Sequence, residues 1–204
     1  MATFNLNILP IYRDNGQELP EAPGLLALTP PRKTARGREH DQFIAYLTLS
    51  GSSLLPDIEL KDLTNDAAVL FYQTHGPLTS AMRKAADQIN SKLLEHNRAS
   101  TGSGQYALGL LVLAVIRENQ CTLLLSGPAH VVWVSEGKSR HIHEPALSGK
   151  GLGGSQSLPA YLSQVESTFP STLPDGMNKI ATAMANSEAQ SQGVRVKGVP
   201  GHSL

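Results

Sequence analysis

Four short runs of β-forming residues, separated by tight turns, constrain the fold of this chain more than any other feature. They span residues 106–116, 121–126, 130–134 and 139–143, and three or four residues connect each run to the next. A connection between parallel strands needs a dozen or more residues, so these runs predict antiparallel hairpins. Gly127 and Pro128 mark the second of the three turns.

The region before these runs predicts a strand followed by two helices. Residues 42–49 are rich in aromatic and β-branched side chains, which is typical of a strand. Between residues 66 and 97 apolar side chains recur at steps of three and four, the spacing of one helix face. Gly76-Pro77 interrupts this stripe, so we expect helices at 66–74 and 78–97. Helices followed by an antiparallel meander indicate the α+β class.

The 204 residues correspond to one domain with two less regular ends. We expect residues 1–34 to form an irregular lead-in with an edge strand near residues 4–11. The prolines that follow residue 15 remove backbone hydrogen-bond donors and disfavour a helix there. Residues 35–185 form the predicted domain, with a last helix near 177–189. Residues 186–204 are expected to form a flexible tail, because residues 191–204 lack apolar periodicity.

Composition excludes several classes of function. The 17 basic and 17 acidic residues balance, so no electrostatic attraction for nucleic acid or for anionic lipid is expected. The longest apolar stretch, residues 107–116, is too short for a membrane helix. The N-terminus lacks the features of a signal peptide, so we expect a cytoplasmic protein. The single cysteine, Cys121, lies in an apolar run and is expected to be a buried hydrophobe.

Two short motifs each allow a functional and a structural interpretation. The glycine-rich segment 149–155 looks like a phosphate-binding loop, but its Lys150 precedes the glycines, which favours a flexible connection. His141 and His143 share one face of a predicted strand and could bind a metal together. No third ligand is visible near them in the sequence, so an exposed face of an edge strand is the alternative.

A succession of partial motifs runs through the middle of the chain. Arg36 lies five residues before Asp41, ahead of the strand at 42–49. A helix, the glycine-rich segment 102–104 and the strands from 107 to 133 follow, and Asp175-Gly176 comes late in the chain. This order resembles the type 2C metal-dependent protein phosphatases over residues 35–185. The resemblance implies an α-β-β-α layered sandwich with antiparallel sheets.

The same resemblance implies a metal centre for which this sequence lacks most of the ligands. Members of the family bind two Mn²⁺ or Mg²⁺ ions through several aspartates and activate a bridging water. Pro128 stands where the family has an aspartate, and His130 where it has an arginine. Asp41 and Asp175 remain as vestigial metal ligands, and two carboxylates cannot hold a two-metal centre.

We therefore expect a catalytically inactive phosphatase 2C-like domain, without catalytic residues or cofactor, that acts as a regulatory or protein-interaction module. Its partner would be a protein or a phosphoprotein, and not nucleic acid or a membrane. The alternative is a divergent serine/threonine protein phosphatase that uses Mn²⁺ or Mg²⁺, with Asp57 or Asp62 joining Asp41 and Asp175. An unrelated α+β protein with coincidental matches is a third possibility.

Overall fold

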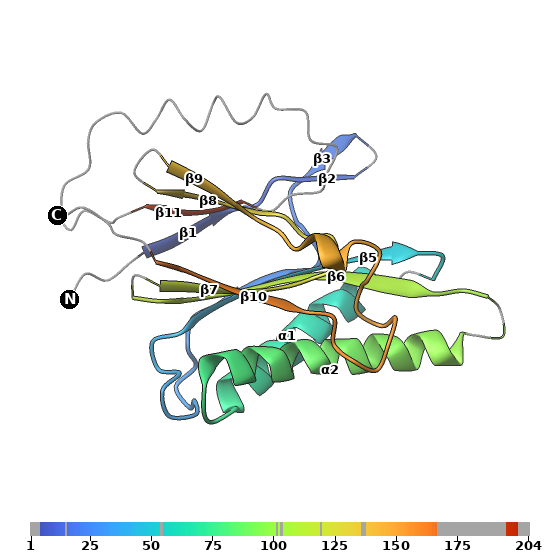
Figure 1. Cartoon of the computed structure of the whole chain (residues 1–204), viewed down its shortest axis with the longest axis horizontal. Helices are drawn as coiled ribbons and strands as arrows, with labels where there is room; N and C mark the ends of the chain where they lie inside the picture. Colours follow the sequence, from blue (N-terminus) through green and yellow to red (C-terminus); the bar gives the residue numbers. More distant parts are fainter. Residues whose placement is uncertain are drawn as a thin grey trace.

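The protein is built in layers, with a central antiparallel sheet between a pair of helices and a second β layer (Figure 1). Helices α1 (Asp57–Gln73) and α2 (Leu78–Ala99) cover one face of the central sheet. The computed structural model describes residues 5–14, 16–53, 55–100, 102, 104–118, 120–135, 138–166 and 195–199.

The central sheet has five strands in the order β10-β7-β6-β5-β4, and every neighbouring pair is antiparallel. The strands are β4 (Leu25–Leu28), β5 (Gln42–Gly51), β6 (Ala107–Arg117), β7 (Gln120–Ser126) and β10 (Tyr161–Glu166). The α+β class and the predicted hairpin of β6 and β7 are confirmed. The predicted lead-in contributes β4 to this sheet, because β4 pairs with β5.

The second β layer consists of two-stranded pairs. It contains β1 (Asn5–Leu9) with β11 (Arg195–Val199), β8 (Val131–Ser135) with β9 (Lys138–Ile142), and the hairpin of β2 (Tyr12–Asp14) with β3 (Gln17–Leu19). β8 therefore does not continue the meander of β6 and β7. Gly127 has a φ of 80°, a conformation that favours glycine, and Pro128 follows it, so the chain turns out of the central sheet there.

Alternation along the strands of the central sheet builds two cores. On β6, Leu111 and Leu113 pack against the helices, whereas Val112 and Ala114 face the second β layer. The core between the central sheet and the second β layer also contains Cys121, which is 3% exposed. Burial also raises the pKa of the Cys121 thiol to about 12. The expectation that Cys121 is buried is confirmed.

The apolar stripe of α2 is confirmed, but α1 begins nine residues earlier than predicted, at Asp57 instead of residue 66. Its buried positions, Leu60, Thr64, Ala67 and Phe71, keep the helical spacing. Polar residues separate these positions in the first half of the helix, so the apolar spacing is difficult to recognise in the sequence. Asp57 and Glu59 in the first turn lie at the positive end of the helix dipole, which favours this start.

The remaining segments complete the outline of the chain. A short 3₁₀ helix, Pro145–Leu147, follows β9. Strand β11 falls inside the predicted tail 186–204, whereas the helix predicted near 177–189 lies outside the described residues. None of the helices in the described part of the chain is long and apolar enough to cross a membrane.

Replacing Leu113 with alanine tests the helix-side core. Leu113 is 0% exposed, so Leu113→Ala should lower the free energy of unfolding by about 2–5 kcal/mol through lost burial and a residual cavity. Urea denaturation measures this change. Val69 lies on α1 and is 53% exposed, so the matched control Val69→Ala should shift stability by no more than about 0.5 kcal/mol. Equal effects of the two variants would contradict the assigned core.

Candidate functional site

Asp41 lies directly before β5, and its side chain is fully buried at 0% exposure. The backbone amide of Asp41 donates to the carbonyl of Arg38 at 3.2 Å, which closes a tight turn in front of the strand. The hydroxyl of Tyr72, on α1, donates to the Asp41 carbonyl at 2.7 Å. The carboxylate is therefore held at the junction of the sheet and the helix layer.

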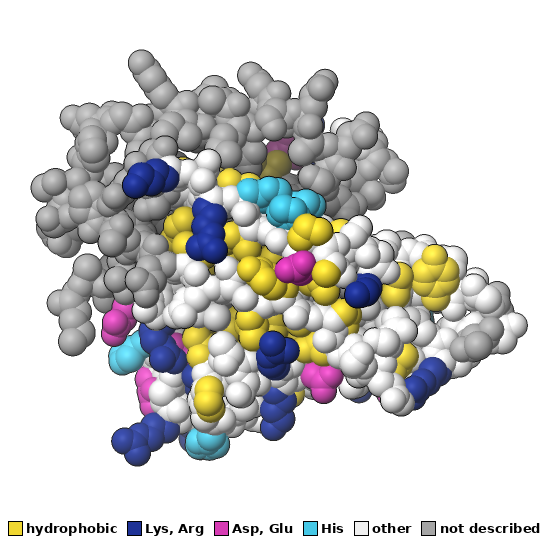
Figure 2. All heavy atoms as spheres, viewed as in Figure 1, with side chains coloured by type: hydrophobic (Ala, Val, Ile, Leu, Met, Phe, Trp, Pro, Cys, Tyr) yellow, Lys and Arg dark blue, Asp and Glu magenta, His cyan; other side chains and the backbone are white. Residues whose placement is uncertain are grey.

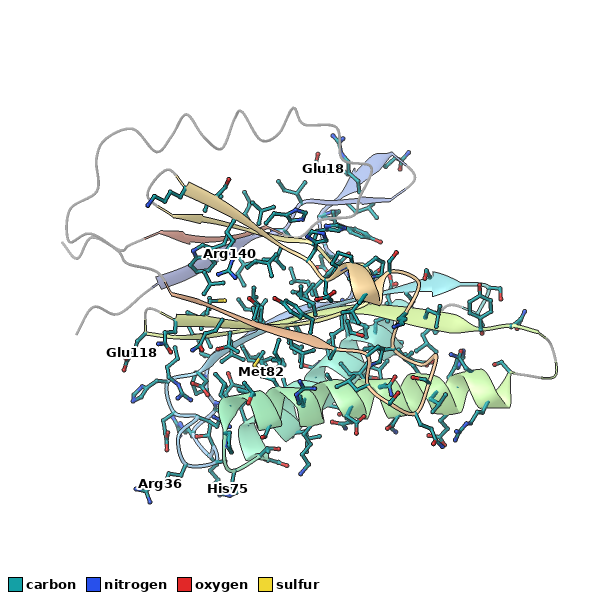
Figure 3. The ribbon with its side chains drawn as sticks, viewed as in Figure 1. Glu18, Arg36, His75, Met82, Glu118 and Arg140 are labelled. Atoms are coloured by element: carbon teal, nitrogen blue, oxygen red, sulfur yellow. The ribbon has the colours of Figure 1, made fainter. Side chains whose placement is uncertain are left out.

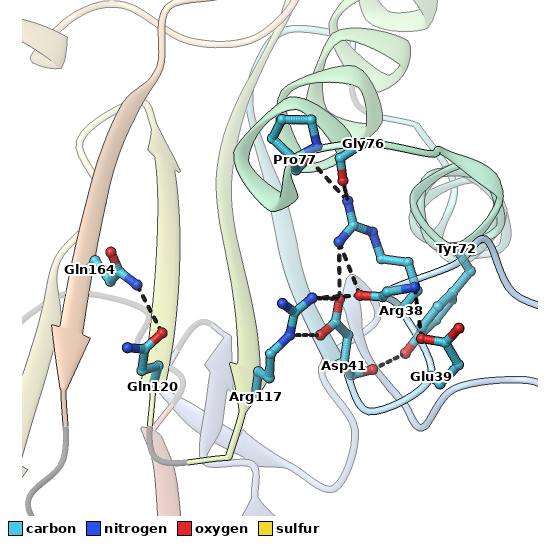
Figure 4. Close-up of polar contacts among 10 residues, drawn as sticks. Arg38, Glu39, Asp41, Tyr72, Gly76, Pro77, Arg117, Gln120 and Gln164 are labelled. Atoms are coloured by element: carbon cyan, nitrogen blue, oxygen red, sulfur yellow. Dashed lines mark hydrogen bonds and ion pairs between the residues drawn. The ribbon is translucent and has the colours of Figure 1, made fainter.

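Arg117 approaches this carboxylate from the neighbouring strand. β5 and β6 pair Gln42 with Ile116, so Asp41 and Arg117 form the next cross-strand pair. The Nε of Arg117 donates to Oδ1 at 2.6 Å, and a terminal nitrogen donates to Oδ2 at 2.9 Å (Figure 4). This is a two-pronged ion pair, the strongest geometry between these groups. Hydrogen bonding to Asp41 raises the pKa of Arg117.

Arg38 supplies a second guanidinium to the same carboxylate. Arg38 is 1% exposed, and one of its terminal nitrogens lies 3.4 Å from Oδ2 of Asp41. The other terminal nitrogen donates to the carbonyls of Gly76 and Pro77, at 2.8 and 3.0 Å. The guanidinium also lies over the ring of Phe71, 5.3 Å from its centroid. Arg38 thus ties the start of β5 to the loop between the two helices.

A divalent cation does not fit at this carboxylate as the side chains stand. Both oxygens of Asp41 accept hydrogen bonds from guanidinium groups, and the side chain has no exposed surface. The other aspartates considered, Asp57 and Asp62, are exposed on α1. In the described residues, the only group of three or more candidate metal ligands lies elsewhere and contains no aspartate. Asp175 lies outside the described residues.

The sequence identified Asp41 but not its partners. Arg36, which has the spacing of the family motif, is exposed and projects away from the sheet in Figure 3. The guanidinium from this segment that reaches Asp41 belongs to Arg38. One feature of the sequence could have indicated a role for Arg117: it is the single charged residue of β6 and stands at the end of a long apolar run.

The glycine-rich segment 149–155 is fixed against the domain and is not a free loop. The Gly153 amide donates to the Asn90 side chain at 2.8 Å, and the Asn97 side chain donates to the Gly153 carbonyl at 3.0 Å. Leu152 forms a β-bridge with Gly109. A Cβ at Gly153 would lie 2.8 Å from that of Leu93, so glycine is needed for this packing. The predicted flexible connection is therefore wrong, since α2 and β6 already bind this backbone.

His141 and His143 share an exposed face, as the alternation along the strand predicts. The structure adds His130, which begins the predicted strand run 130–134 and was not connected with these two histidines in the sequence. Burial and the neighbouring imidazoles lower the pKa of His130, which favours its neutral form. These three residues are called the histidine trio below.

Comparison with known proteins gives structural neighbours but no sequence relatives. No family model matches the sequence, and no curated protein matches it. A serine/threonine phosphatase of S. agalactiae aligns with a TM-score of 0.58 at 10% identity, over 81% of this chain and 75% of that chain. Stp1 of Staphylococcus aureus aligns with a TM-score of 0.52 at 11% identity, over 82% and 72%. PstP/Ppp of Mycobacterium tuberculosis gives a TM-score of 0.50 at 12% identity, over 81% and 73%.

These similarities show the fold that the sequence suggested. The chain has the fold of the type 2C metal-dependent protein phosphatases, a mixed α/β architecture with antiparallel sheets. Identities of 10 to 12% carry the architecture only, so the activity of those enzymes is not transferred with it.

Removing the Asp41 carboxylate should destabilise the protein strongly. Asp41→Asn leaves the guanidinium of Arg38 buried without its counter-charge, which costs about 3–5 kcal/mol of unfolding free energy. Asp66 is exposed on α1, so the control Asp66→Asn should change stability by less than about 0.5 kcal/mol. Chemical denaturation compares the two variants. A wild-type-like Asp41→Asn would contradict a structural role for this carboxylate.

Proposed function

We propose that this domain has the architecture of a phosphatase without phosphatase activity, and that it acts by binding a protein partner. The observation that carries this proposal is the pairing of Asp41 with Arg38 and Arg117. In the resemblance drawn from the sequence, Asp41 takes the place of a metal-binding aspartate. Here its charge is balanced by guanidinium groups of the same chain.

Electrostatics supports the exclusion of a metal from this position. Two unit charges 4 Å apart interact by about 4 kcal/mol at an effective dielectric constant of 20, and a divalent ion doubles that figure. A cation bound at Asp41 would meet this repulsion from each guanidinium in contact with the carboxylate. Arg117 is partly exposed and could swing away, but Arg38 is 1% exposed and fixed by Gly76 and Pro77.

The packing of the core supports the proposal that this domain is a folded scaffold. The core between the sheet and the helices is continuous, with Leu47, Met82 and Leu124 all at 0% exposure. Figure 3 places Met82 between the central sheet and α2. A stable scaffold without a metal centre can still recognise a surface, and binding of a protein or phosphoprotein is the proposed role.

Phosphatase and metal assays on the same sample test this proposal. The intact chain should not hydrolyse p-nitrophenyl phosphate or a phosphothreonine peptide in Mn²⁺ or Mg²⁺. Titration calorimetry should show no stoichiometric binding of either ion, because no described group of carboxylates is available to hold it.

A matched pair of variants separates true turnover from contamination. The double variant Asp57→Asn/Asp62→Asn removes both exposed carboxylates that the active alternative could use, and Asp66→Asn removes one that it would not. Metal-dependent hydrolysis that is lost in the double variant and kept in Asp66→Asn would overturn the proposal and establish a divergent phosphatase. Hydrolysis that persists in both proteins at the same trace level points to a contaminating enzyme and leaves this chain inactive.

A further inference from the structure

The histidine trio gathers three imidazoles on the surface of the second β layer. His130, His141 and His143 are all exposed, and one ring nitrogen of each lies within 4.8 Å of those of the other two. Nδ1 of His130 lies 2.9 Å from Nε2 of His141. Figure 2 shows histidine side chains gathered at the surface over the upper strands. Elsewhere in the described residues no other group of three such ligands occurs.

The hairpin of β8 and β9 fixes this arrangement. Its register pairs Val131 with Ile142, so His130 and His143 are the next pair across the hairpin. His141 is two residues before His143 and therefore shares its face. Ile142 and Val131 point the other way, into the core below, and anchor the hairpin. Backbone pairing between the two strands thus holds His130 next to His141 and His143, which follow it by 11 and 13 residues in the chain.

A hollow of about 240 Å³ lies beside the trio, and His130 and His143 are among the residues that line it. A ligand bound to an ion at the trio would therefore have space on the side of His130 and His143. Three protein ligands with one open position are typical of sites where a metal also binds water or a small molecule.

We propose that the histidine trio is a binding site for a transition-metal ion, and that Zn²⁺ is the ion its ligands suit best. Imidazole nitrogens suit zinc, copper and nickel, whereas Mg²⁺ and Mn²⁺ prefer oxygen ligands. A tetrahedral zinc with bonds of about 2.0–2.1 Å needs ring nitrogens about 3.3 Å apart. The nitrogens of the trio start within 4.8 Å.

Small rotations of the side chains complete the site. The rings are stacked, with interplanar angles of 20°, 19° and 15° between the three pairs. Each ring must turn about its side-chain torsions so that its nitrogen lone pair points to a common ion. Because all three side chains are exposed, such turns meet little packing resistance. This site is independent of Asp41 and of the proposed loss of phosphatase activity.

Zinc binding to the full, untagged chain tests the inference. Competition with a chromophoric chelator should give one Zn²⁺ per chain at micromolar concentration. His130→Ala, His141→Ala and His143→Ala should each weaken binding by roughly tenfold or more. His75 lies exposed in the loop between the helices, on the other side of the central sheet from the hairpin of β8 and β9 (Figures 1 and 3), so His75→Ala should bind zinc as the wild type does.

Cobalt substitution adds a readout of geometry. Co²⁺ in a site of low coordination number has intense visible absorption, which should appear in the wild type and in His75→Ala and disappear in His143→Ala. Absence of zinc binding would overturn the proposal. Binding that is unchanged in His130→Ala would also overturn it, because the trio would then act only as a surface pair of histidines. Circular dichroism of each variant verifies folding, which the exposure of these side chains should preserve.

Discussion

The pairing of the buried Asp41 carboxylate with two guanidinium groups joins the main parts of the structure. Arg117 comes from β6, and Arg38 reaches across to the loop between the helices. A carboxylate removed from water is costly unless it is paired and hydrogen-bonded, and here both of its oxygens accept hydrogen bonds from guanidinium groups. The same contacts engage both oxygens that a cation at Asp41 would need.

The layered fold explains how these groups meet. The long pairing of β5 with β6 carries Arg117 to the level of Asp41, and α1 brings Tyr72 against the Asp41 carbonyl. On the opposite face, the turn at Gly127 and Pro128 sends β8 and β9 into the second layer. His130 follows this turn and lies across the hairpin from His143. Pro128, which stands where the resembling family has an aspartate, therefore lies close to the histidine trio in the chain.

The sequence predicted much of the fold and less of the site. Alternation and short turns predicted the hairpin of β6 and β7, and the apolar stripe predicted α2. The start of α1 was missed because polar residues such as Asp62 and Asp66 separate its buried positions. Asp41 was singled out, but Arg117 is 76 residues away in the chain, and only strand register brings the two together. His130 was missed for the same reason, since it joins the trio across a hairpin.

Paramagnetic relaxation by Mn²⁺ tests most directly whether guanidinium groups stand in place of a metal at Asp41. In NMR spectra of the His130→Ala variant, which lacks the intact trio, dilute Mn²⁺ should leave the backbone amide of Asp41 and the Nε–H of Arg117 unbroadened. This result is expected because both carboxylate oxygens already accept hydrogen bonds from guanidinium groups. Selective broadening of these two signals at low Mn²⁺ would place the ion at Asp41 and contradict the account.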